Sequence, residues 1–271
     1  RDLVRSRGLG DVYKRQVLAI GDAPTDITSH SVATSHFYDI FRYQILDTNS
    51  YIEEIWAYGY WAIDRCARII KEGTSFKEVT KGDLAEVEGC IAQAYAIKAL
   101  CSFYLTNMFG LPYSEANKTT LGIVNITEPV PAYSQVSRVS VEQNYSLILD
   151  DITKAKEYYA KEGVENVGKQ YMNTAAVAAL EARVKLYMKN YEGAITAAQE
   201  AITLSGGTIV STKEDYKNMY TTLAVSTEDI FFIAKAEDDY LSANALNTLW
   251  NKYGLSINLS LIHISEPTRP Y

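Results

Sequence analysis

The sequence predicts a mainly α-helical fold, in which helical hairpins carry a long loop insertion and a short β element. Several segments repeat apolar residues every three or four positions, and capping residues and glycines bound most of them. One pair of these segments is joined by a very short connection. The chain has 271 residues, 47% of them hydrophobic, which is enough to form a sizeable core.

The first helix is expected to run from Ser50 to Gly73. Ser50 and Glu53 have the spacing of a capping box, in which each side chain satisfies a backbone N–H at the start of a helix. The apolar stripe that follows consists of Ile52, Ile55, Gly59, Ile63, Cys66 and Ile70.

The second and third helices flank the insertion. The second is predicted to open at Asp83 with Glu86 and to stop at Gly110, and the third begins with a capping box made by Ser140 and Gln143. The connection between them, residues 110–139, contains several prolines. Long loops inside a compact domain are usually functional, so we expect this insertion to have a function beyond connecting two scaffold helices.

The fourth and fifth helices are predicted to form an antiparallel hairpin. Asn173 or Thr174 caps the fourth, which breaks at Asn190, and the fifth follows almost at once and stops at Gly206. The hairpin resembles a tetratricopeptide unit because small residues stand where that repeat packs its helices closely. These residues are Ala182, Ala194 and Ala201.

Two segments after the hairpin complete the prediction. Residues 228–236, with the sequence EDIFFIAKA, are expected to form a short buried strand. Residues 238–253 are ambiguous between loop and helix, and we assign them to a helix.

The composition favours a neutral ligand. A net charge of −7 without strong basic clusters argues against nucleic acid and against an anionic membrane surface. The 21 tyrosines supply amphipathic rings, most of which we expect in ordinary packing. The three cysteines lack the spacing of metal ligands, so we expect buried thiols and no metal site or other cofactor.

The two ends differ from the middle of the chain. Residues 1–16 are basic and residues 259–271 resemble a translated adapter, so we interpret both as non-native tails around a domain at 17–258. The alternative is a genuine basic arm and a proline-containing tail.

The order of elements resembles the N-terminal half of the SusD/RagB family over about residues 20–258. The resemblance is carried by IWAYGYWAIDRCARII, by the helix that ends in NMFGLPYSEA, by SRVSVEQNYSLILDDITKA with Arg138 before its cap, by the hairpin and by EDIFFI. Each motif alone is weak, whereas their order and spacing together are fairly specific.

The resemblance implies a non-catalytic component of an outer-membrane uptake complex. Family members are helical, surface-exposed lipoproteins of Bacteroidetes-type bacteria that bind glycans or other nutrients and cap a TonB-dependent transporter barrel. It therefore implies an oligosaccharide or polysaccharide ligand, the barrel as partner, and a location at the cell outer membrane. The lipid-bearing cysteine and the C-terminal half of the family pattern are absent from the sequence, so we expect a truncated domain and membrane attachment only through the missing anchor.

The candidate ligand-binding residues come from the loops before the first helix and from the start of the insertion. Sugar C–H faces lie on aromatic rings while polar side chains bond the hydroxyls, and residues 21–51 are rich in both kinds. For each residue the alternative is a solvated loop group, a helix cap or ordinary packing. The candidates are Asp26, His30, Arg42, Tyr43, Asn49, Tyr51 and Tyr113.

Two other functions compete with glycan binding. A tetratricopeptide-like scaffold would hold a protein partner, although the 110–139 insertion fits it poorly. An enzyme is disfavoured because the sequence has no G-x-S-x-G, H-E-x-x-H, P-loop or dinucleotide motif. Adjacent acids such as Asp150 and Asp151 point about 100° apart on a helix, which does not suit a pair of catalytic carboxylates.

Overall fold

The structure is a computed structural model that describes residues 20–21, 23–25, 28–30, 37–79, 84–221, 225–233 and 255–257. The chain divides into two compact units, which are described separately. We call Arg1–Gly59 with Lys235–Tyr271 the small unit, and Tyr60–Ala234 the helical unit. Three predicted segments lie outside the described residues: the tails at 1–16 and 259–271 and the helix expected at 238–253.

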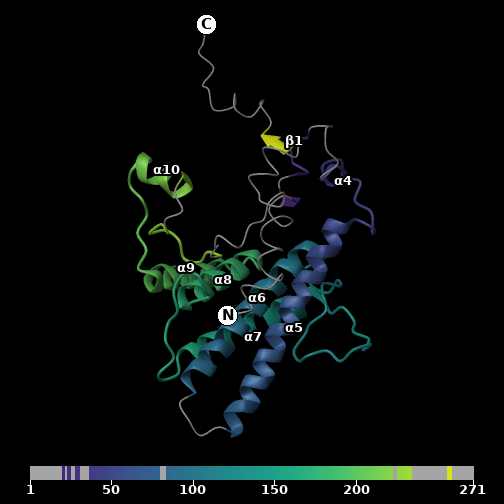
Figure 1. Ribbon diagram of the computed structural model, residues 1–271. Coiled ribbons are helices and arrows are strands. Elements are labelled where there is room, and N and C mark those ends of the chain that lie inside the picture. Colours follow the sequence, from purple (N-terminus) through teal and green to yellow (C-terminus); the bar gives the residue numbers. More distant parts are fainter. Residues whose placement is uncertain are drawn as a thin grey trace, which may run out of the picture. The chain divides into compact units, whose positions relative to one another are not determined.

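The helical unit is a set of packed helices (Figure 1). Helices α6 and α7 pack along each other, α8 and α9 do the same, and α7 also contacts α8. The unit contains α5 (Ser50–Val79) from Tyr60 onward, α6 (Ala85–Phe109), α7 (Val141–Tyr159), α8 (Thr174–Tyr187), α9 (Tyr191–Ser205) and α10 (Lys213–Thr221). The mainly α-helical class and the α8–α9 hairpin are therefore confirmed.

Most helix boundaries follow the predicted caps. At the start of α7, the Gln143 amide N–H donates to Ser140 Oγ at 3.2 Å, and the Ser140 N–H donates to Gln143 Oε1 at 3.0 Å. Asn173 caps α8 by accepting from the Ala176 N–H at 2.8 Å. Helix α9 ends at Gly206, whose φ of 58° is the left-handed conformation that glycine adopts without strain.

Gly73 was expected to end the first helix, and that prediction is wrong. Helix α5 continues to Val79, and a Cβ added at Gly73 would lie 2.9 Å from Ile91 Cγ1 of α6. The glycine therefore allows two helices to pack closely. The predicted cap Asp83 lies outside the described residues, and α6 begins after Leu84, whose side chain makes no capping bond.

The strand expected at 228–236 is also not formed in its described part, 228–233. The segment is half-buried, and the Phe232 N–H donates to the Lys169 carbonyl at 3.0 Å. A short apolar run does not distinguish a strand from another buried segment, which explains the error. The short β element is found in the small unit instead.

The 110–139 insertion is tied to the helices at its base. Asn144 of α7 accepts from the Ile123 N–H at 2.8 Å and donates to the Ile123 carbonyl at 3.1 Å. The hydroxyl of Tyr60 in α5 donates to the Val124 carbonyl at 3.1 Å and accepts from the Val124 N–H at 2.8 Å. These bonds satisfy the backbone N–H and C=O groups of Ile123 and Val124, which belong to no helix or strand.

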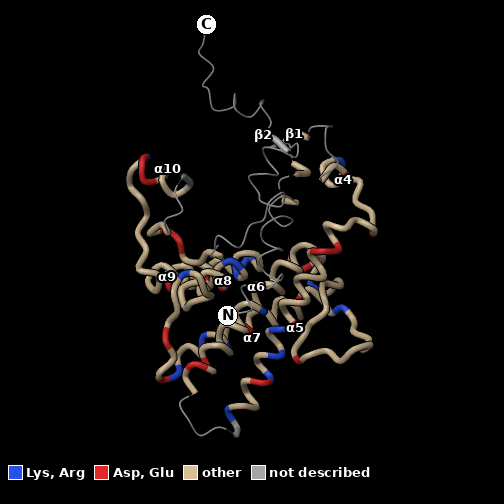
Figure 2. Tube along the Cα trace, in the orientation of Figure 1, with Lys and Arg blue, Asp and Glu red and all other residues tan. Residues whose placement is uncertain are grey.

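A buried ion pair joins α6 to α7. Lys98 Nζ lies 2.9 Å from Asp151 Oδ1, and the two side chains are 3% and 1% exposed. Burial raises the pKa of the Asp151 carboxyl to about 6, and Lys98 partly opposes this rise. The other charges of the described helices are of mixed sign (Figure 2).

The three thiols do not share one environment. Cys66 and Cys101 are buried, as expected, whereas Cys90 is exposed because the first turns of α6 are only half-buried. Within the described ranges, no group of three or more His, Cys, Asp or Glu side chains is placed to hold a metal ion. No helix of those ranges is both long enough and apolar enough to cross a bilayer.

The small unit contains a two-stranded antiparallel sheet and a short helix. Strand β1 (Thr28–His30) pairs with β2 (Leu255–Ile257), and His30 lies opposite Leu255. Helix α4 (Tyr38–Phe41) follows β1. Ala23, Phe37 and Ile40 form the buried cluster of this unit, and Ile20 and Tyr51 pack against it.

Candidate ligand-binding surface

Three of the predicted candidates lie together at α4. The His30 ring centroid is 5.2 Å from that of Tyr38 and 5.6 Å from that of Phe41. The Arg42 guanidinium carbon lies 5.5 Å from the Tyr38 ring centroid, and its Nη1 donates to Tyr38 Oη at 3.0 Å. Tyr43 follows directly, and its hydroxyl donates to the Pro24 carbonyl. We call His30, Tyr38, Phe41, Arg42 and Tyr43 the aromatic cluster.

Tyr43 presents its ring from a strained backbone. Its φ is 57°, which is uncommon for a bulky residue and costs on the order of 1–3 kcal/mol. The conformation is fixed where α4 ends, because the Tyr43 N–H donates to the Ile40 carbonyl and the Gln44 N–H donates to the Asp39 carbonyl. Tyr43 nevertheless remains 74% exposed, so burial of the ring recovers little of this cost. Lys189 has a similar φ of 62° just after α8, so this conformation is that of a residue that ends a helix.

The remaining candidates of the small unit have structural roles. Asn49 caps α5, since its Oδ1 accepts from the backbone N–H groups of Tyr51 and Ile52 at 3.1 and 3.3 Å. The predicted cap, Ser50, is instead the first residue of the helix. The Tyr51 ring stacks on Phe37 with centroids 4.3 Å apart. Asp26 lies outside the described residues.

Tyr113 belongs to the helical unit and packs on the scaffold. Its ring meets that of Tyr145 edge to face, with centroids 4.9 Å apart and an interplanar angle of 64°. Burial raises the pKa of the Tyr145 phenol to about 12, and its hydroxyl donates to Asn107 Oδ1 at 3.2 Å. Tyr113 is half-buried, so its ring is partly used in packing.

Sequence reasoning missed Tyr38 and Tyr133. Tyr38 lies between two predicted residues, and its spacing of four from Arg42 was the available signal. Tyr133 of the insertion is fully exposed and has a φ of 64°. It follows Pro131, whose carbonyl accepts from the Ser134 N–H at 3.2 Å. The insertion therefore displays a ring in the same strained conformation as Tyr43.

Comparison with protein families decides the classification. The model for SusD-like proteins, described as "Starch-binding associating with outer membrane", matches residues 5–186, which is more than half of the chain. The chain belongs to the SusD-like family. The resemblance predicted from the order of elements is thereby confirmed, and the family is one of carbohydrate-binding proteins associated with the outer membrane. Among curated proteins, no sequence matches.

Solved SusD-like structures have the same fold. A putative sugar binding protein from Bacteroides vulgatus ATCC 8482 is 24% identical with a TM-score of 0.81, covering 97% of this chain and 59% of that one. A SusD superfamily protein from Bacteroides thetaiotaomicron VPI-5482 is 24% identical with a TM-score of 0.74, covering 85% and 50%. A laminarin binding SusD-like protein is 19% identical with a TM-score of 0.59, covering 78% and 45%. This SusD-like chain thus spans roughly half the length of these structures.

Proposed function

We propose that the chain binds a neutral oligosaccharide or polysaccharide and does not turn it over. The observation that carries this proposal is the SusD-like family match over residues 5–186, with its starch-binding description. The solved structures named as sugar binding and laminarin binding support the same class of ligand. Action within a TonB-dependent uptake complex at the outer-membrane surface is part of the proposal and follows from the family.

The aromatic cluster offers the chemistry for such a ligand. The exposed Tyr43 ring gives a sugar C–H face an apolar platform, and Arg42 gives the sugar hydroxyls hydrogen-bond donors. Arg42 uses Nη1 on Tyr38, and its side chain is otherwise exposed. A net charge of −7 disfavours polyanionic glycans, so the proposed ligand is uncharged.

The test is retention of the whole chain in native gels that contain laminarin or soluble starch. Tyr43→Ala should weaken retention about threefold to tenfold, because a ring contact contributes about 0.5–1.5 kcal/mol. Tyr191→Ala is the matched control, since Tyr191 is a comparably exposed tyrosine on α9. Equal retention of both variants removes Tyr43 from the site. Failure of the unaltered chain to bind any neutral glycan, or reducing ends that accumulate with time, overturns the proposal.

A protein-interaction scaffold is the second candidate, and one observation favours it. On α9 the small residues Ala194, Ala197 and Ala201 are buried, whereas Ile195 and Ile202 are exposed. These two isoleucines are seven residues apart and so share one helix face. If glycan binding is the function, replacing both isoleucines with serine should leave glycan retention unchanged. If the chain is a protein-interaction scaffold, the same change should abolish capture of its protein partner.

A further inference from the structure

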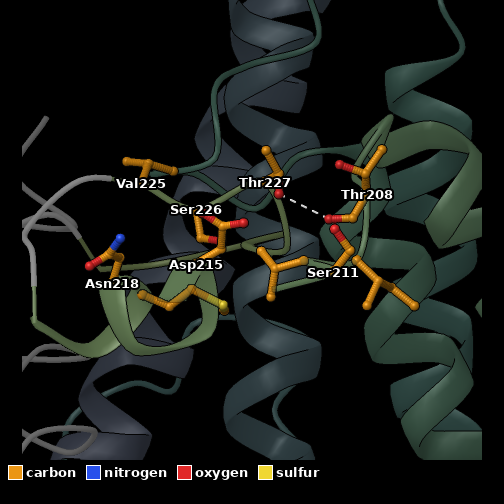
Figure 3. Close-up of a pocket in the computed structure, with 10 residues that line it drawn as sticks. Thr208, Ser211, Asp215, Asn218, Val225, Ser226 and Thr227 are labelled. Carbon is orange, nitrogen blue, oxygen red and sulfur yellow. Dashed lines mark hydrogen bonds between the residues drawn. The ribbon is translucent and has the colours of Figure 1, made fainter. Parts of the chain in front are cut away.

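The helical unit also holds a surface pocket of about 380 Å³ (Figure 3). Its walls are the segment 208–211, one face of α10 and the segment 225–227. We propose that this pocket binds a single neutral sugar unit. The inference rests on the proposed glycan-binding function and assigns a second set of residues to it, distinct from the aromatic cluster.

The two segments of the pocket are fixed to each other. Thr227 Oγ1 donates to the Thr208 carbonyl at 2.9 Å, as drawn in Figure 3, and the Val210 N–H donates to Glu228 Oε1 at 2.6 Å. A Cβ added at Gly207 would lie 2.7 Å from the Thr227 carbonyl oxygen, so only glycine permits this approach. These two walls are therefore preformed, which lowers the entropic cost of binding.

Helix α10 supplies the third wall, and its first turn is capped. Thr212 and Asp215 cap its first turn, since the Asp215 N–H donates to Thr212 Oγ1 at 3.0 Å and Thr212 Oγ1 donates to Asp215 Oδ2 at 2.6 Å. Asn218 and Met219 follow at three and four residues after Asp215, so all three share one helix face, and all three line the pocket.

The lining groups match a sugar in size and chemistry. Asp215 accepts hydrogen bonds, whereas the Ser211 hydroxyl and the Asn218 amide both donate and accept, as sugar hydroxyls do. Val225 and Met219 add apolar surface for the C–H groups of a sugar ring. The volume is at the small end for ligand pockets, which fits about one ring.

The lining of the pocket favours a neutral ligand. Among the described residues that line it, Asp215 alone carries a charge, and Lys169 Nζ donates to the carbonyl of the lining residue Ser226 at 3.1 Å. A phosphorylated or carboxylated sugar would place like charges together at close range, which is unfavourable. The inferred ligand is therefore an uncharged sugar, either free or as one unit of a glycan.

The experiment is methyl NMR of the whole chain with ¹³C-labelled methionine. The sequence has four methionines, and of these Met219 lines the pocket. Titration with methyl α-glucoside, methyl α-galactoside and methyl α-mannoside should shift the Met219 methyl signal saturably with at least one of them, while the other three methionine signals stay in place. Met219→Leu assigns the signal.

Variants of α10 test the polar contacts. Asn218→Leu should raise the dissociation constant of the sugar about threefold to tenfold. Glu214→Gln, at an exposed position outside the pocket lining, should leave that constant unchanged. Glucose 6-phosphate should bind more weakly than the neutral sugars. Asp215→Asn should narrow that difference, because it removes the charge and keeps the shape.

The possible outcomes separate this site from the proposed function. If the chain retains polysaccharide but the Met219 signal does not shift at high millimolar sugar, the pocket does not bind sugar. The proposal for the aromatic cluster is then unaffected. A Met219 shift that survives Tyr43→Ala confirms two separate sets of binding residues. Tighter binding of glucose 6-phosphate than of neutral sugars also overturns the pocket assignment.

Discussion

Replacing Lys98 with methionine would leave the Asp151 carboxylate buried without its cation. The two side chains are 3% and 1% exposed and lie 2.9 Å apart, so water cannot replace the lost partner. Removing one member of a buried pair costs about 3–5 kcal/mol of unfolding free energy. We expect that loss for Lys98→Met at pH 7, and we expect Lys98→Met with Asp151→Leu to recover most of it.

The pH dependence of this effect has a definite sign. The folded-state pKa of Asp151 is raised from 3.8 to about 6, so its contribution to stability is fully present below about pH 4 and is lost as the pH rises through 6. A rise of about two pKa units corresponds to a change of about 3 kcal/mol in unfolding free energy between low and neutral pH. Loss of Lys98 raises the pKa of Asp151 further. The carboxyl is therefore mostly protonated at pH 5 with or without Lys98, and the cost of Lys98→Met should be smaller there than at pH 7.

Urea unfolding followed by circular dichroism at pH 5 and pH 7 measures both effects. The matched control is Lys154→Met, which breaks the exposed pair that Lys154 makes with Asp150 at 2.7 Å and should cost less than about 1 kcal/mol. The reasoning is refuted if the two lysine variants are equally stable at pH 7, or if Lys98→Met is more damaging at pH 5.

Three further changes follow from local geometry. Gly122→Ala should cost about 2 kcal/mol in urea unfolding, because its Cβ would lie 2.0 Å from the buried Asn144 Oδ1. Tyr43→Gly should change the unfolding free energy by less than about 1 kcal/mol, because glycine adopts a φ of 57° without strain but the bond from the Tyr43 hydroxyl to the Pro24 carbonyl is lost, while glycan retention falls. At pH 8, a thiol reagent should modify Cys90 quickly and the two buried cysteines only after unfolding. Burial raises the pKa of Cys101 to about 12 and that of Cys66 well above its ordinary value.

Each of these expectations has a clear contradicting result. An unchanged midpoint for Gly122→Ala would mean that Asn144 is not held by Ile123 as described. A loss of well over about 1 kcal/mol for Tyr43→Gly would mean that the Tyr43 side chain stabilises the fold by more than its bond to Pro24. Rapid modification of more than one thiol before unfolding would place Cys66 or Cys101 near solvent.

Features set by neighbours in sequence were more predictable than those set by distant partners, although Asn49 and not the predicted Ser50 caps α5. The Ser140–Gln143 capping box depends on residues three apart, so its pattern is legible in the sequence. The role of Gly73 depends on Ile91 of another helix, and no local signal separates a packing glycine from a helix stop. A glycine inside a helical pattern is therefore ambiguous until its partner is known.

The candidate site divides in the same way. His30 and Arg42, candidates from composition, both contact Tyr38, and Tyr43 follows Arg42 in the chain, but α4 has only four residues, too few to show a periodicity. The pocket depends on bonds between residues 18 and 19 positions apart, such as Thr227 to Thr208. Turn-rich segments like these carry no pattern that would pair them in advance.

The way in which the insertion is anchored has a consequence for its hydrogen exchange. The Ile123 and Val124 amides are bonded by side chains of α7 and α5, and Ile123 is buried, so these amides should exchange only when the helices separate. Tyr133 is fully exposed in the same loop, and the amides near it should exchange within seconds. One connection thus contains both a slow and a fast segment, and the surface ring at its tip is free to adjust while its base stays part of the core.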